Sequence, residues 1–131
     1  MAGLHISCGT FSGDDKSGSA FEAVLKALGN VSDDLVPSIT SGFETSEFVT
    51  ISATQAEVLL PALIEYRKAL VEEIGHQDWR RATADDEKAG LDPVKAKWGQ
   101  GNGWRLYCVT DLIAACKTAV TEHQEVVVVL C

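Results

Sequence analysis

Basic residues are scarce in this sequence. It has 11 lysines and arginines against 19 aspartates and glutamates, so its formal net charge at pH 7 is −8 and its isoelectric point is near 4.7. Nucleic acids and anionic membranes are bound chiefly through basic side chains, so this balance predicts that neither is a partner. An acidic surface favours instead a basic protein, whose approach it can steer, although many cytosolic proteins carry one for solubility alone.

Long apolar runs are also absent. No run approaches the roughly 20 residues that span a bilayer. The first residues, MAGLHISC, lack the basic segment and long apolar core of a secretion signal. We therefore expect a cytoplasmic protein.

The sequence also lacks closely spaced cysteine pairs. The four cysteines, Cys8, Cys108, Cys116 and Cys131, match no CxxC or zinc-ribbon spacing. In the cytoplasm they should be free thiols. The acidic runs have no EF-hand spacing either, so the sequence does not support a calcium site. We expect no bound metal and no cofactor.

The length and the apolar content of the chain are typical of a folded globular protein. A length of 131 residues with 46% apolar residues predicts a single domain, residues 1–131, whose core needs no disulfide or metal. Short apolar runs at 4–8 and 48–51 predict strands. Between them, an apolar face that recurs with helical spacing predicts a helix over 19–29.

The longest predicted helix begins at a capping box. Ser52 and Gln55 have the S-x-x-Q spacing in which each side chain caps the backbone of the other, and Gly75 is a suitable stop. Pro61 lies within this helix and should kink or break it, because proline has no N–H to donate and its ring clashes with the preceding turn.

The second half of the chain is less regular. Residues 76–103 are rich in charge and glycine without a sustained period, which predicts a long surface segment with at most one helical turn. Residues 104–109 read as a strand, and Thr110 can cap a helix that reaches about residue 123. The β-branched run 126–129 predicts a strand that is buried on both faces.

These elements predict an α/β fold, with mixed α+β as the alternative. We expect about four strands in a mixed sheet with three helices packed on it. The C-terminal strand should be central, and the alternation of strands and helices favours some parallel pairing.

The loop in HISCGTFSGDDKSGSAF, residues 5–21, invites comparison with a phosphate-binding P-loop. That motif needs four residues between its glycines and a lysine directly after the second. Here Gly9 and Gly13 are one residue too close, and Asp14 and Asp15 stand before Lys16, where their charges would repel phosphate. The loop is better explained as a solvated turn.

A cysteine nucleophile is a further possibility, with a histidine as its base. Catalytic cysteines need an electropositive, partly exposed site, whereas these lie in apolar segments of an acidic chain, so we predict no catalytic residue. The candidate nucleophiles are Cys8, Cys108 and Cys131, and the candidate bases are His5, His76 and His123.

Acidic side chains and two tryptophans form the candidate partner-binding set. Carboxylates can pair with lysine and arginine on a protein, and exposed tryptophan rings are natural interface anchors. The alternative is that the carboxylates are merely solvated and the rings pack back onto the domain. The candidate residues are Glu44, Glu47, Trp79, Asp85, Asp86 and Trp98.

Three segments carry a resemblance to known proteins: GLHISCGTF, FVTISATQAEVLLPALIEYRKAL and WRLYCVTDLIAACKTAVTEHQEVVVVLC. Their order resembles that in small bacterial and phage proteins, and in immunity proteins of polymorphic toxin systems. The resemblance covers about two thirds of the chain, omits residues 76–103 and rests on pattern without a catalytic motif. It implies a cytosolic protein that covers the active site of a cognate toxin.

We therefore expect a non-enzymatic inhibitor that binds a basic protein, such as a toxin domain, through an acidic surface. One alternative is a protein that binds a small molecule or nucleotide signal, of the phage anti-defence type, through the loop at 9–18 and the start of the first helix. A third is a small enzyme with cysteine and histidine chemistry.

Overall fold

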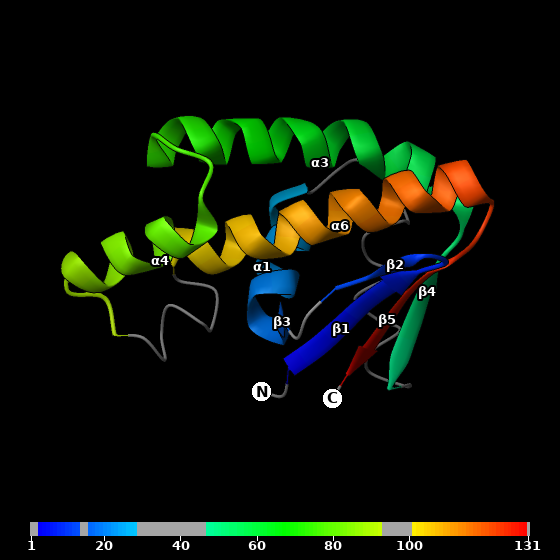
Figure 1. The fold of residues 1–131 in the computed structure, drawn as a ribbon, viewed down its shortest axis with the longest axis horizontal. Helices are drawn as coiled ribbons and strands as arrows, with labels where there is room; N and C mark the ends of the chain where they lie inside the picture. Colours follow the sequence, from blue (N-terminus) through cyan, green and yellow to red (C-terminus); the bar gives the residue numbers. More distant parts are fainter. Residues whose placement is uncertain (1–2, 14–15, 29–46, 93–100, 131) are drawn as a thin grey trace.

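The structure is a computed structural model of the chain and describes residues 3–13, 16–28, 47–92 and 101–130 (Figure 1). Its elements in chain order are β1 (Gly3–Cys8), β2 (Phe11–Ser12), β3 (Lys16–Ser17), α1 (Gly18–Leu28), β4 (Phe48–Ile51), α3 (Ala53–Ile74), α4 (Trp79–Lys88), α6 (Asn102–Glu122) and β5 (Val126–Leu130). The fold is therefore mixed α/β, as predicted, although the described residues contain four helices rather than three.

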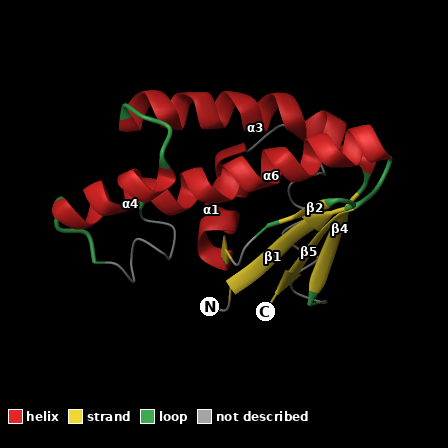
Figure 2. Cartoon of the chain, in the orientation of Figure 1, coloured by secondary structure: helices red, strands yellow, loops and turns green. Residues whose placement is uncertain are grey.

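The sheet is antiparallel throughout the described strands. Its order is β2-β1-β5-β4, and β3 also pairs with β1. The prediction that the C-terminal strand is central is confirmed, because β5 lies between β1 and β4. The predicted parallel pairing is wrong: α3 and α6 run out and back, so the chain re-enters the sheet at the end where β4 left it (Figure 2).

The central helix α6 occupies a segment that the sequence analysis divided wrongly. The predicted strand at 104–109 is helical, and Thr110 lies inside α6, where its hydroxyl donates to the Leu106 carbonyl oxygen at 2.7 Å. Within α6, Lys117 and Thr121 are the only exposed residues. A helix that is covered on nearly all sides has no amphipathic period, which is why its pattern resembled a strand.

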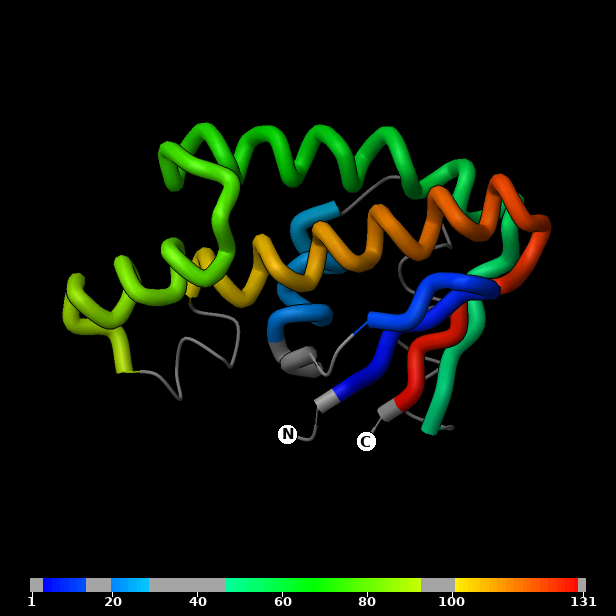
Figure 3. The backbone as a smooth tube through the Cα atoms, viewed as in Figure 1, coloured from blue at the N-terminus to red at the C-terminus, as the bar shows by residue number. Residues whose placement is uncertain are grey.

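The layers follow from what α6 contacts. It packs against β1, α1, α3 and α4, and it lies between α3 and the sheet (Figure 3). Arg67 of α3 joins the two long helices by donating to the Thr110 hydroxyl at 3.1 Å. Consequently α3 is an outer helix with one face turned away from the core.

The ends of α3 match the prediction closely. The Ser52 hydroxyl accepts from the Gln55 N–H at 3.1 Å, and the Gln55 side chain accepts from the Ser52 N–H at 2.9 Å. Gly75 ends the helix in the left-handed conformation at φ 91°. Pro61 does not break the helix, which runs through it to Ile74 because tertiary packing against α6 holds both halves.

Strand β5 shows alternating burial. Val126 and Val128 are fully buried, whereas Val129 is 37% exposed and its neighbour across the ladder, Phe48, is 54% exposed. The prediction of burial on both faces is therefore wrong at Val129. The described helices pack on the face of the sheet that carries Val126 and Val128, and Phe48 and Val129 lie on the opposite face.

Candidate interaction surface

The predicted partner-binding residues do not all fall in one place. Glu47 is exposed and directly precedes β4, whereas Trp79, Asp85 and Asp86 belong to α4, at the opposite end of the molecule from β4 (Figure 1). Glu44 and Trp98 lie outside the described residues. The structure therefore brings three of the six residues together, on a helix that the sequence analysis missed.

That helix, α4, corrects the prediction of at most one helical turn over 76–103. Asp78 caps its first turn by accepting from the Arg80 N–H at 3.0 Å, and the helix spans ten residues. Most of its side chains are charged, and its apolar side consists chiefly of Trp79 and the buried Ala82, so the apolar face is too short to stand out in the sequence. An aspartate just before Trp79 was the available sequence signal.

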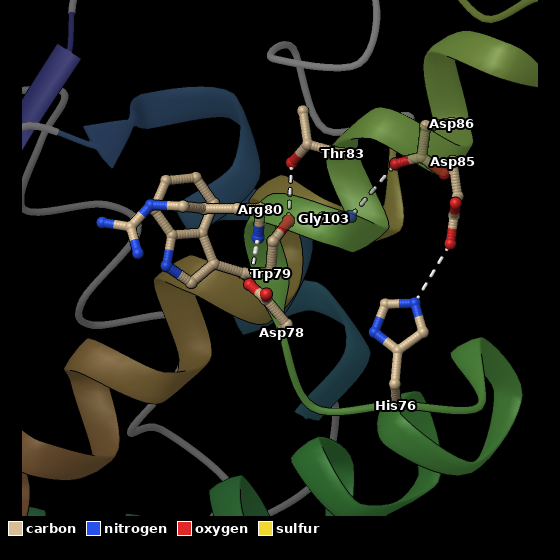
Figure 4. A network of polar contacts seen from close by, with 8 residues as sticks. All are labelled: His76, Asp78, Trp79, Arg80, Thr83, Asp85, Asp86 and Gly103. Atoms are coloured by element: carbon tan, nitrogen blue, oxygen red, sulfur yellow. Dashed lines mark hydrogen bonds and ion pairs between the residues drawn. The ribbon is translucent and has the colours of Figure 1, made fainter.

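Trp79 is engaged within the fold. Its ring stacks on that of Tyr107 with centroids 3.8 Å apart, and the Trp104 ring lies at 6.3 Å. The Arg80 guanidinium carbon lies 5.0 Å from the centre of the Trp79 ring (Figure 4). Trp79 is half-buried at the contact between α4 and α6, so most of its ring area serves that contact.

Asp86 also has an internal partner. Its Oδ2 accepts from the Gly103 N–H at 3.1 Å, at the start of α6 (Figure 4). The capping position of α6 is Gly101, which makes no side-chain cap hydrogen bond. The Asp86 carboxylate satisfies one of the open N–H groups there and opposes the positive end of the helix dipole.

Asp85 pairs with a histidine at the end of α3. Nε2 of His76 lies 3.0 Å from Oδ2 of Asp85 (Figure 4). The hydrogen bond from His76, assisted by the charges of His76, Arg81 and Lys88, lowers the pKa of Asp85. This pair fastens α4 to the α3–α4 connection.

The loop that resembled a phosphate site is fastened by a carboxylate. Glu122, at the end of α6, accepts from the Thr10 N–H at 3.2 Å and from the Thr10 hydroxyl. Gly13, in the same loop, lies so close to the Asp111 carboxylate that an added Cβ would be 2.8 Å from its oxygen. Two acidic side chains therefore flank the backbone that a phosphate would need.

The cysteines of the described segments are buried thiols. Cys8, Cys108 and Cys116 all lie in the core. Burial raises the pKa of Cys116 to about 12, and burial together with the Glu122 charge raises the pKa of Cys8. The raised pKa values keep the Cys8 and Cys116 thiols protonated and poorly nucleophilic at neutral pH. The described residues contain no group of His, Cys, Asp and Glu arranged to hold a metal ion.

The outer face of α3 is a surface that the sequence analysis did not consider. Val58 and Ile64 are 45% and 43% exposed there, and the exposed Pro61 lies between them. Glu57 and Glu65 are exposed on the same side of the helix. The signal in the sequence was a second set of apolar residues, at 58, 61 and 64, outside the buried stripe. The solvent-facing side of a helix is normally polar, so these positions stand out.

Comparison with protein-family models, curated proteins and solved structures gave no significant match. Within the described segments, none of the helices is both long and apolar enough to cross a membrane.

Proposed function

We propose that this protein acts by binding a basic protein partner, without catalysing a reaction, and that it serves as an immunity protein that neutralises a toxin. The observation that carries the proposal is the charge of its outermost helix. The exposed ionisable residues of α3 comprise one base, Lys68, and four acids, Glu57, Glu65, Glu72 and Glu73. With a formal net charge of −8 for the chain, this surface attracts a basic protein and accelerates its association.

The groups that would serve the alternative functions are otherwise engaged. The Thr10 N–H and hydroxyl, which could hold a phosphate, donate to the Glu122 carboxylate. The Cys8 and Cys116 thiols, which could act as nucleophiles, are buried with raised pKa values. These contacts favour binding through the surface over a nucleotide-signal site or cysteine chemistry.

We propose the cytoplasm as the place of action. An immunity protein must meet its toxin where the toxin acts, and buried thiols outside disulfides suit a reducing compartment. The roles of Glu44, Glu47, Trp79, Asp85, Asp86 and Trp98 in partner binding stay predictions.

The test is capture of the partner followed by neutralisation. Tagged full-length protein, purified from its native host and analysed by native mass spectrometry, should carry a basic protein at a fixed stoichiometry. Expression of that protein alone should arrest growth, and co-expression should restore it. A captured protein without toxicity would contradict the immunity role, and a small-molecule mass increment on otherwise bare protein would favour the nucleotide-signal alternative.

A further inference from the structure

The outer face of α3 combines unpartnered apolar side chains with acidic ones. Val58, Pro61 and Ile64 are spaced three residues apart and form a continuous ridge on the side of the helix opposite its buried stripe. Burying large apolar side chains lowers the free energy relative to leaving them in water. A contiguous row of such side chains on an outer surface is therefore typical of interfaces.

Pro61 adds a polar feature to this ridge. In an α-helix the N–H of residue 61 would donate to the carbonyl oxygen of Glu57, but proline has no N–H. The Glu57 carbonyl is therefore deprived of its intrahelical donor on the side of the helix where Pro61 is exposed. A partner that brings an N–H group can satisfy this acceptor.

The charges beside the ridge indicate the chemistry of that partner. Glu57 and Glu65 are exposed next to the apolar residues, and Lys68 is the one exposed base of α3. Arginine fits all three features: its aliphatic stem covers apolar surface, its guanidinium pairs with carboxylates, and its spare N–H groups can reach a carbonyl oxygen. A second copy of the chain would bring carboxylates against carboxylates, which opposes self-association through this face.

We propose that the outer face of α3, with the ridge of Val58, Pro61 and Ile64 at its centre, docks an arginine-bearing surface of a basic protein. This assignment rests on the proposed function and specifies where the partner binds. It moves the interface from α4, whose Trp79, Asp85 and Asp86 have partners within the fold, to a helix whose exposed side chains do not contribute to the core.

Pro61→Ala gives the most discriminating test. The substitution restores the missing N–H and removes an interior proline, so the melting temperature should rise. The same change gives the Glu57 carbonyl oxygen an intrahelical N–H donor and removes the side chain at the centre of the ridge. Affinity for the purified captured partner should therefore fall at least about fivefold. Opposite changes in stability and binding cannot come from loss of folding.

Ile64→Arg and the double variant Glu57→Lys/Glu65→Lys should each weaken binding by at least about tenfold while the melting temperature changes little. The matched control is Glu87→Lys, which makes a charge reversal at an exposed position of α4 and should change the dissociation constant by less than about threefold.

Each outcome bears on a different claim. If wild-type protein captures no basic protein, the proposed function fails and this assignment fails with it. If the partner binds all α3 variants as tightly as wild type, the proposed function stands and the α3 assignment is overturned. If sedimentation shows a wild-type dimer that Ile64→Arg dissociates, the face binds a second copy, which also overturns the assignment.

Discussion

Trp79 and Tyr107 stack with ring centroids 3.8 Å apart and ring planes within 4° of parallel. One ring comes from α4 and the other from α6, so the stack holds a mostly charged helix against the central helix of the fold. α4 has Ala82 as its one buried residue, and its attachment therefore depends on this stack and on polar contacts.

Replacing Trp79 tests that dependence. Trp79→Ala should lower the free energy of unfolding by about 2 kcal/mol, because it removes a half-buried aromatic ring and its stacking contact with Tyr107. Arg80→Ala, which removes the exposed side chain whose guanidinium lies near the same ring, should cost less than about 1 kcal/mol. Urea denaturation measures both. A Trp79→Ala variant with unchanged stability and lost partner binding would identify the ring as an interface anchor instead.

Asp86 should behave as a surrogate cap of α6. Asp86→Ala removes the acceptor of the Gly103 N–H and should cost about 1 kcal/mol. Asp86→Asn keeps a side-chain oxygen that can accept this hydrogen bond, so it should retain part of that stability. Equal losses in the two variants would mean that charge, rather than the hydrogen bond, provides the stabilisation.

Gly103 is required by the close approach of α4 to α6. A Cβ at this position would lie 2.5 Å from the Thr83 backbone nitrogen and 2.7 Å from its Cα, so the helices would have to separate. Gly103→Ala should cost about 3 kcal/mol. Gly75→Ala is the contrasting variant: a Cβ there meets no atom within 4 Å, but φ is 91°, so backbone strain alone should cost about 1 kcal/mol.

The His76–Asp85 contact predicts a pH dependence at the acidic end. Because the pKa of Asp85 is lowered in the folded protein, its contribution to stability is present above the ordinary pKa of 3.8 and is lost as pH falls through the lowered value. Melting temperatures of wild type and Asp85→Asn should therefore differ near neutral pH and converge in acid. A difference that persists at the lowest pH would contradict this assignment.

Local patterns predicted the elements whose ends or faces carry a clear chemical signature. The Ser52–Gln55 capping box and Gly75 located both ends of α3, and short apolar runs located β1, β4 and β5. These features depend on neighbouring residues only, so one sequence suffices to identify them.

Features that depend on tertiary neighbours were missed. The first half of α6, read as a strand at 104–109, is covered on nearly every side and lacks the polar face that identifies a helix, whereas the helix predicted from Thr110 to about residue 123 is the second half of α6. The apolar face of α4 consists of little more than Trp79 and Ala82, which is too few residues to stand out in the sequence. The contacts of Trp79, Asp85 and Asp86 each join α4 to another segment, so their internal roles could not be inferred before the fold was known. The exposed ridge on α3 was visible in the sequence only as apolar residues outside the buried stripe.

Whether an acidic surface of this protein binds a basic protein is tested by the salt dependence of affinity. The dissociation constant of the purified complex, measured by titration calorimetry from about 50 to about 500 mM NaCl, should rise steadily as the surface charges are screened. Glu57→Lys/Glu65→Lys should flatten that slope and Glu87→Lys should not. A wild-type affinity that stays constant over this range would mean that surface charge does not drive the association.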